Sequence, residues 1–96
     1  MGIREILTSK REEILRVAAR HGARNVRVFG SVVRGEATEE SDIDFLVDLA
    51  PGRTLLDHAA LLLDLERLLQ RRVDVVTERA LRTRIRDHIL REAISL

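Results

Sequence analysis

Two short stretches of the sequence carry groups that could bind phosphate and metal ions. In the first, Gly30 and Ser31 stand at the end of an apolar stretch, where the chain must turn sharply. Amides beside a glycine can approach a ligand closely, and aimed N–H donors next to a hydroxyl suit an anionic phosphate. Taken alone, a Gly-Ser pair is also what an ordinary turn at a strand end contains. A phosphate site therefore needs a second feature beside it.

The second stretch holds two aspartates, Asp42 and Asp44, separated by one apolar residue. In a strand, side chains two residues apart point to the same face, so the two carboxylates lie together and Ile43 lies opposite. Adjacent like charges on a half-buried strand raise each other's pKa and destabilise the fold, which favours a neutralising cation. Oxygen ligands alone favour Mg²⁺ or Mn²⁺. The alternative is a strand with acidic residues at its solvent-exposed positions.

A third carboxylate, Asp74, interrupts an apolar β-branched stretch over residues 73–77. An acidic residue has no local structural purpose there. If this strand lies beside the strand of Asp44, three carboxylates converge, as metal-dependent phosphoryl or nucleotidyl transfer requires. Asp48 continues the alternation on the same face, but at the rise of a strand it lies roughly 20 Å from Asp42 and roughly 13 Å from Asp44, too far to share a metal. Asp48 is therefore the weaker candidate.

Periodicity and turn residues predict the elements that must position these groups. Ser9 and Glu12 have the spacing of a capping box, which predicts that a first helix begins there. Apolar alternation with β-branched residues predicts strands, and apolar residues at helical intervals predict helices. The predicted elements are a helix over 9–20 with 2–8 as a candidate extension, strands over 25–29, 42–49 and 73–77, a helix over 54–70, and a helical region over 78–94 that breaks near Thr83.

The last two helical regions each carry a regular apolar pattern. The helix over 54–70 has adjoining stripes suited to burial, made of Leu55, Leu62 and Leu69, and of His58, Leu61, Leu65 and Leu68. The C-terminal region repeats apolar residues every four positions, at Leu81, Ile85, Ile89 and Ala93. Arginines crowd the rest of that region, at Arg79, Arg82, Arg84, Arg86 and Arg91. They form either a partner-binding surface or a solvated face.

The composition excludes several classes of protein. Ninety-six residues, 10.9 kDa, suffice for a single domain over residues 1–96 with one core. Seventeen basic and sixteen acidic side chains give a net charge of +1, so the uniform positive field of a stand-alone nucleic-acid binder is absent. Phe29 and Phe45 are the only aromatic residues, so the chain has no platform for stacking bases. We therefore expect no direct binding of nucleic acid.

Targeting signals are also absent from the sequence. The first residues lack the apolar core of a signal peptide, and the longest apolar run, residues 59–63, is far shorter than the roughly 20 residues that cross a bilayer. The chain has no cysteine, which excludes a disulfide framework and a thiolate metal site. We expect a cytoplasmic protein without a membrane partner.

Together, these motifs resemble a known family. Gly30-Ser31, ten further residues and then Asp42-x-Asp44 form a pattern that is similar to the signature of the DNA polymerase beta-like nucleotidyltransferase superfamily. Phe29-Gly-Ser-x-x-Arg-Gly-Glu36 and Ser41-Asp-Ile-Asp-Phe-Leu-Val47 more closely resemble the minimal nucleotidyltransferase (MNT) family, whose members are of similar length. The resemblance extends from about residue 14 onward and includes an equivalent of Asp74.

The resemblance implies an α/β fold, a small mixed sheet flanked by helices, and a metal-dependent nucleotidyltransferase. It implies that Asp42, Asp44 and Asp74 hold two divalent ions, Mg²⁺ or alternatively Mn²⁺, and that ATP is the substrate. Gly30, Ser31 and Arg34 would contact the nucleotide. For Arg34, pairing with Glu36 or Glu39 at the surface is the alternative. The chain departs from many members at Val32, where they carry an arginine after Gly-Ser, so a phosphate contact is lost there.

The resemblance also implies a partner. Proteins of the MNT family are commonly encoded beside HEPN-domain ribonuclease toxins, and they act as antitoxins by transferring AMP from ATP to a tyrosine hydroxyl of the toxin. This chain contains no tyrosine, which excludes tyrosine self-modification. Two alternatives stay open. One is an antitoxin that inhibits its partner by binding alone, and the other is a nucleotidyltransferase that acts on a small molecule or an RNA end.

Overall fold

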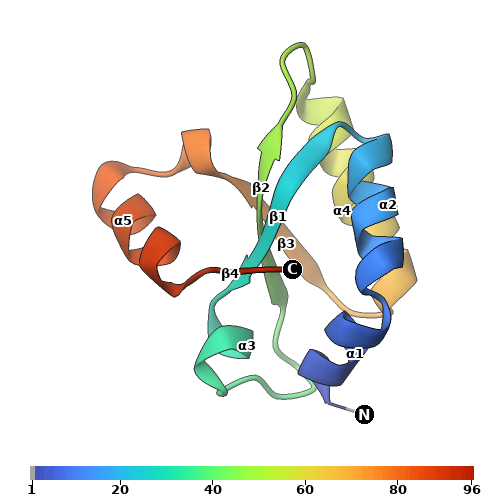
Figure 1. The fold of residues 1–96 in the computed structure, drawn as a ribbon, viewed down its shortest axis with the longest axis vertical. Coiled ribbons are helices and arrows are strands. Elements are labelled where there is room, and N and C mark those ends of the chain that lie inside the picture. Colours follow the sequence, from blue (N-terminus) through green and yellow to red (C-terminus); the bar gives the residue numbers. More distant parts are fainter. Residues whose placement is uncertain (1) are drawn as a thin grey trace.

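The computed structural model describes residues 2–96 and contains a four-stranded sheet with helices on both sides (Figure 1). The strands are β1 (Ala23–Phe29), β2 (Ile43–Leu49), β3 (Val73–Thr77) and β4 (Ile94–Ser95), in the spatial order β3-β2-β1-β4. The helices are α1 (Ile3–Ser9), α2 (Arg11–Arg20), α3 (Ser31–Arg34), α4 (Leu55–Leu69), the 3₁₀ helix η1 (Glu78–Ala80) and α5 (Thr83–Glu92). Strand β2 pairs parallel with β3, whereas β1 pairs antiparallel with β2 and β4. The predicted α/β fold with a small mixed sheet is confirmed.

The two faces of the sheet are covered unequally. Helices α1, α2 and α4 lie on one side of the sheet (Figure 1), and the odd-numbered residues of β2 join their core. Ile43, Phe45 and Val47 are completely buried there. On the opposite face, α5 packs through Ile89 against Leu46 in a much smaller cluster. The even-numbered positions of β2 therefore lie on the more open face of the sheet.

The capping box forms at a different helix from the predicted one. Ser9 is the last residue of α1, and its hydroxyl donates to a carbonyl of that same helix at 3.1 Å, so the predicted box with Glu12 is wrong. The residues before Ser9 form a separate short helix, and its last turn uses the hydroxyl. Instead, Thr54 and Asp57 cap α4: the Thr54 side chain accepts a backbone N–H, and Asp57 accepts the N–H of Thr54 at 2.8 Å.

The predicted helix over 54–70 is confirmed, but one of its two stripes is wrong in part. Leu61, Leu65 and Leu69 are buried against the sheet, as a stripe at intervals of four requires. Leu55, which was predicted to join the buried face, is 84% exposed. It lies in the first turn of α4, which reaches beyond the end of β2 (Figure 1). The helical pattern continues there, but the sheet does not.

The C-terminal region contains a strand that the pattern did not predict. The predicted break near Thr83 is confirmed, because η1 ends at Ala80 and α5 begins at Thr83. After α5, Ile94 pairs with Val28 of β1 and forms the edge strand β4. Two residues are too few to produce a detectable strand pattern. This short strand fixes the end of α5 against the sheet.

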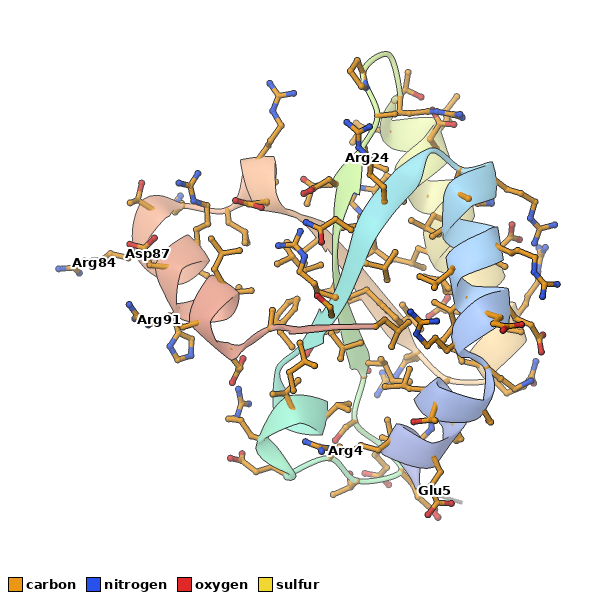
Figure 2. All side chains as sticks on the ribbon, in the orientation of Figure 1. Arg4, Glu5, Arg24, Arg84, Asp87 and Arg91 are labelled. Atoms are coloured by element: carbon orange, nitrogen blue, oxygen red, sulfur yellow. The ribbon has the colours of Figure 1, made fainter. Side chains whose placement is uncertain are left out.

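The arginines of the C-terminal region are exposed. Figure 2 shows Arg84 and Arg91 projecting from α5 away from the rest of the molecule, with Asp87 beside them. Ile85 on the same helix is 52% exposed, although it follows the apolar repeat. A role for this surface in partner binding stays a prediction. Among residues 2–96, every helix is too short or too polar to cross a membrane.

Candidate active site

The parallel pairing of β2 and β3 brings Asp44 and Asp74 to the same position of neighbouring strands. Two of the three predicted carboxylates are therefore neighbours on the more open face of the sheet. Burial raises the pKa of the Asp44 carboxyl, and the charges of Asp74 and Asp42 raise it further, to about 6. A carboxylate destabilised in this way gains most from a nearby cation.

Gly30, at the end of the neighbouring strand β1, lies against Asp44. It has φ of 79° and ψ of −149°, a conformation that residues with a Cβ rarely adopt. A Cβ at this position would also collide with Oδ2 of Asp44. The Asp44 side chain thus lies against the backbone of the Gly-Ser turn, and the two predicted motifs form one site. Ser31 follows directly and is the first residue of α3.

Asp42 lies just before β2 and pairs with an arginine outside the group formed by Asp44, Asp74 and Gly30. Its Oδ1 lies 3.3 Å from Nε of Arg72 in an ion pair, and its side chain is 49% exposed. Within residues 2–96, no three acidic or histidine side chains are placed closely enough together to hold a metal ion. The donor chemistry nevertheless fits Mg²⁺, because Asp44 and Asp74 supply neighbouring oxygen ligands whose mutual repulsion a cation relieves.

Arg34 connects the site to two acidic residues. Its Nη1 donates to Oε1 of Glu92 at 2.6 Å, and its Nε lies 3.4 Å from Oε1 of Glu36. Of the two surface pairings considered from the sequence, the one with Glu36 is present and Glu39 makes none with Arg34. The guanidinium also lowers the pKa of Asp44, so Arg34 acts electrostatically on the carboxylate pair as well.

Glu92 belongs to this site, and the sequence analysis missed it. Oε2 of Glu92 accepts the backbone N–H of Gly30 at 3.0 Å while Oε1 accepts from Arg34. Burial alone would raise the pKa of the Glu92 carboxyl, but the bonds from Arg34 and Gly30 outweigh it and hold this pKa below its usual value. No local motif marks Glu92, since its partners lie about 60 residues earlier in the chain.

Asp48 is the carboxylate of β2 that the structure separates from this group. It accepts from Nη2 of Arg27 at 3.1 Å and from the side-chain amide of Asn25 at 3.1 Å. Arg27 is buried and also lies 3.5 Å from Glu78. Asp48 therefore compensates a buried guanidinium, which agrees with its rank as the weaker candidate.

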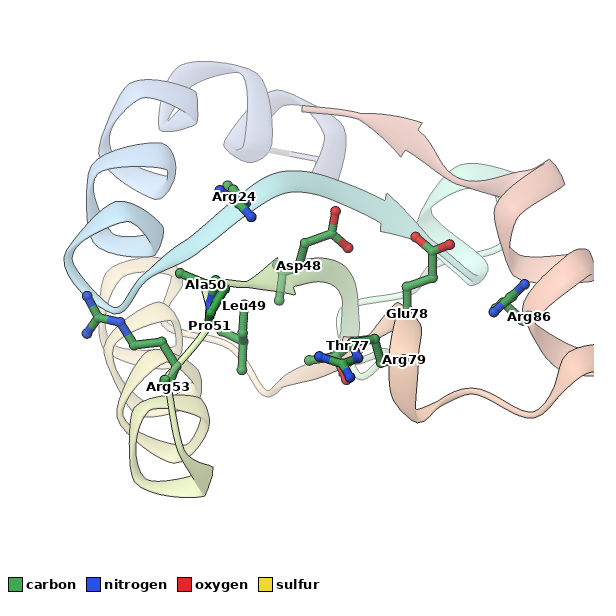
Figure 3. A pocket seen from close by; sticks show the side chains of 12 residues that line it. Arg24, Asp48, Leu49, Ala50, Pro51, Arg53, Thr77, Glu78, Arg79 and Arg86 are labelled. Carbon is green, nitrogen blue, oxygen red and sulfur yellow. The ribbon is translucent and has the colours of Figure 1, made fainter.

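A cavity of about 530 Å³ lies beside Asp48, at the end of the sheet face that is far from Asp44. Figure 3 shows Asp48 and Glu78 inside it, with Arg24 on one side and Arg86 of α5 on the other. Of the acidic candidates, only the weaker one, Asp48, lines the cavity, and Gly30, Ser31 and Arg34 do not. The candidate site is instead the place where Asp44 lies beside Asp74 and against Gly30.

Comparison with known proteins identifies the family. The family model of the nucleotidyltransferase domain matches residues 10–96. The chain belongs to this family. It is a nucleotidyltransferase, and its motif residues lie within the matched segment.

The relatives of this nucleotidyltransferase cover nearly its whole length. Protein adenylyltransferase MntA of Thermococcus cleftensis is 44% identical over 92 residues, which are 96% of this chain and 90% of that protein. MJ0435 of Methanocaldococcus jannaschii, assigned as a protein adenylyltransferase, is 38% identical over 96 residues, covering 100% of this chain and 99% of that protein.

The solved structures agree with this assignment. A structure assigned as a minimal nucleotidyltransferase superposes with a TM-score of 0.88 at 61% identity and covers 96% of this chain and 94% of its own. The resemblance to minimal nucleotidyltransferases is thus confirmed. A toxin–antitoxin structure with AMP-PNP has a TM-score of 0.75 at 22% identity, over 88% of this chain and 69% of that chain, and shares the fold.

Proposed function

We propose that this nucleotidyltransferase transfers AMP from ATP to a hydroxyl group, most directly a tyrosine hydroxyl, of a HEPN-domain toxin and thereby acts as its antitoxin. The observation that carries the proposal is the placement of Asp44 beside Asp74 and against Gly30, so that paired carboxylates meet a turn suited to phosphate. The name of the Thermococcus relative, a protein adenylyltransferase, supports the type of reaction.

The proposed reaction forms a bond between the acceptor oxygen and the α-phosphorus of ATP. The bond from that phosphorus to the oxygen bridging to the β-phosphate breaks, and its electron pair leaves with pyrophosphate. Asp74 is exposed on the same face as Asp44, which supports a role for its carboxylate in accepting the hydroxyl proton. Ser31 and the Gly30 backbone would orient the phosphates, and Arg34 would balance part of their charge.

Metal ions complete the proposed site. Asp44 and Asp74 would hold the ions, with Asp42 as a third ligand, and Mg²⁺ or Mn²⁺ fits this set of oxygen donors. When bound, such ions polarise phosphoryl oxygens and neutralise developing charge. The chain itself positions the ligands for these ions, because the parallel register of β2 and β3 holds Asp44 and Asp74 side by side.

The partner is proposed to be a toxin for two reasons. Structural relatives of the same fold come from toxin–antitoxin complexes, and one of these was solved with AMP-PNP. The chain itself contains no tyrosine, so a tyrosine acceptor has to come from another protein. Because ATP is the proposed substrate, we place both proteins in the cytoplasm.

Intact-mass spectrometry of the purified HEPN-domain partner tests this function. The partner is incubated with this protein, ATP and Mg²⁺, and we expect a gain of one or more AMP units. EDTA should stop the reaction and added Mg²⁺ should restore it. Asp44→Asn should remove the gain, whereas Glu13→Gln, at an exposed glutamate of α2 on the other side of the sheet, should retain it.

A different outcome would favour one of the alternatives. If the partner's mass stays constant while a stable complex blocks its ribonuclease activity, the protein is an antitoxin that acts by binding. If AMP is found instead on an RNA end or a small molecule, the acceptor class is wrong. Fragmentation of a modified partner would identify the acceptor side chain.

A further inference from the structure

The Glu92 carboxylate is bound at two points of the candidate site. One oxygen accepts the Gly30 N–H at 3.0 Å, and the other accepts from Nη1 of Arg34 at 2.6 Å. The side chain of Glu92 is 12% exposed, whereas that of Arg34 is 44% exposed. A carboxylate with one bond to each oxygen and little contact with water is a specific contact rather than a loose surface pair.

The backbone around Glu92 is held by packing on both sides. Before it, Ile89 is buried against Phe29 and Leu46 on the open face of the sheet. After it, Ile94 pairs with Val28 of β1. Helix α5 and strand β4 thus deliver the carboxylate to the Gly-Ser turn, and only the side chain of Glu92 is free to rotate away.

The two donors that hold Glu92 are also the donors that the proposed function gives to the nucleotide. A backbone N–H has one hydrogen and makes one strong bond, so it cannot serve a carboxylate and a phosphate together. The negative charge of Glu92 also repels a phosphate that approaches Arg34. We infer that Glu92 competes with the phosphates of the nucleotide for Gly30 and Arg34 and thereby sets the affinity for ATP, an inference that rests on the proposed function for the class of ligand.

Direct binding of ATP in the presence of Mg²⁺, measured by isothermal titration calorimetry, tests this inference. Glu92→Gln keeps the size of the side chain but removes its charge, and we expect the Kd for ATP to fall about fivefold to tenfold. The gain should shrink at high salt, because ions screen the repulsion that has been removed. Glu78→Gln is the matched control, since Glu78 faces Arg27 at the far end of the same sheet face, and it should leave the Kd unchanged.

The opposite result would overturn the inference. If Glu92→Gln binds ATP with equal or lower affinity, Glu92 positions the turn and does not compete. Glu92→Asp is the second variant, because the shorter side chain keeps the charge but cannot reach both donors, and it should also bind ATP more tightly. In the wild-type protein, the Gly30 amide resonance should shift on addition of ATP and Mg²⁺, and an unchanged resonance would contradict the competition.

This experiment separates the inference from the proposed function because binding needs no acceptor. Tighter binding by Glu92→Gln without any AMP on the partner would support competition and reject the transfer reaction. AMP on the partner with an unchanged Kd for Glu92→Gln would support the transfer reaction and reject the competition.

Discussion

Strand β2 presents two aspartates on the same face of the sheet. The groups around one of them are negatively charged, whereas the other contacts a positively charged side chain. Asp44 lies among other carboxylates, and burial together with Asp74 and Asp42 raises its pKa to about 6. Asp48, four residues on, accepts hydrogen bonds from a buried arginine and an asparagine. One end of the strand is thus electrostatically strained and the other is compensated. Strain of this kind persists where a ligand relieves it, which is why the Asp44 end is the candidate site.

Transfer activity should separate the two aspartates most strongly. Asp44→Asn removes a proposed metal ligand, and we expect transfer to fall on the order of 10³-fold, since a bound metal contributes several kcal/mol to transition-state stabilisation. Asp48→Asn should change the rate by less than about threefold at a temperature where it is folded. The measurement is the initial rate of AMP incorporation into the partner. Equal losses in both variants would break the distinction.

For the stability of the fold, the substitution at Asp48 should have the larger effect of the two. Asp48→Asn takes a carboxylate away from the buried Arg27, which then keeps one carboxylate, that of Glu78 at 3.5 Å, and the carbonyl of Asn25. We expect the free energy of unfolding to fall by roughly 1–2 kcal/mol and Tm by about 5–10 °C. Far-UV circular dichroism follows the transition, because the chain has neither tryptophan nor tyrosine. An unchanged Tm would show that water compensates Arg27 equally well.

The smallest expected effect is the dependence of Asp44 on pH. The folded protein holds the Asp44 proton more tightly than the unfolded chain, in which the pKa is near 3.8, so the wild type loses stability as pH rises through about 6. Asp44→Asn should therefore be more stable than the wild type at pH 7.5, by less than about 1 kcal/mol because Asp44 is partly exposed and water screens the charges.

The difference between the two proteins should vanish below about pH 4. Melting curves in EDTA at pH 4 and pH 7.5 measure it. A difference that is the same at both pH values would mean that carboxylate repulsion does not strain this end of β2.

Local patterns predicted most of the fold. The strands over 42–49 and 73–77 and the helix over 54–70 agree with β2, β3 and α4 within a residue, because each has a strong periodicity. The errors occur where a contact from elsewhere decides. Ser9 ends a helix instead of beginning one, and Leu55 is exposed because α4 extends past the sheet. Strand β4 is too short to have a pattern of its own.

The sequence by itself determined the chemistry of the candidate site. Residue type and spacing marked Gly30, Asp42, Asp44 and Asp74, because alternation in a strand and the requirement for glycine in a sharp turn are local properties. Only the tertiary structure decided which carboxylates lie together. Asp44 lies beside Asp74 because β2 and β3 pair in parallel, and Glu92 reaches Gly30 across 62 residues because α5 folds back over the sheet. Such contacts depend on strand order and helix docking, which the packing of the whole chain determines.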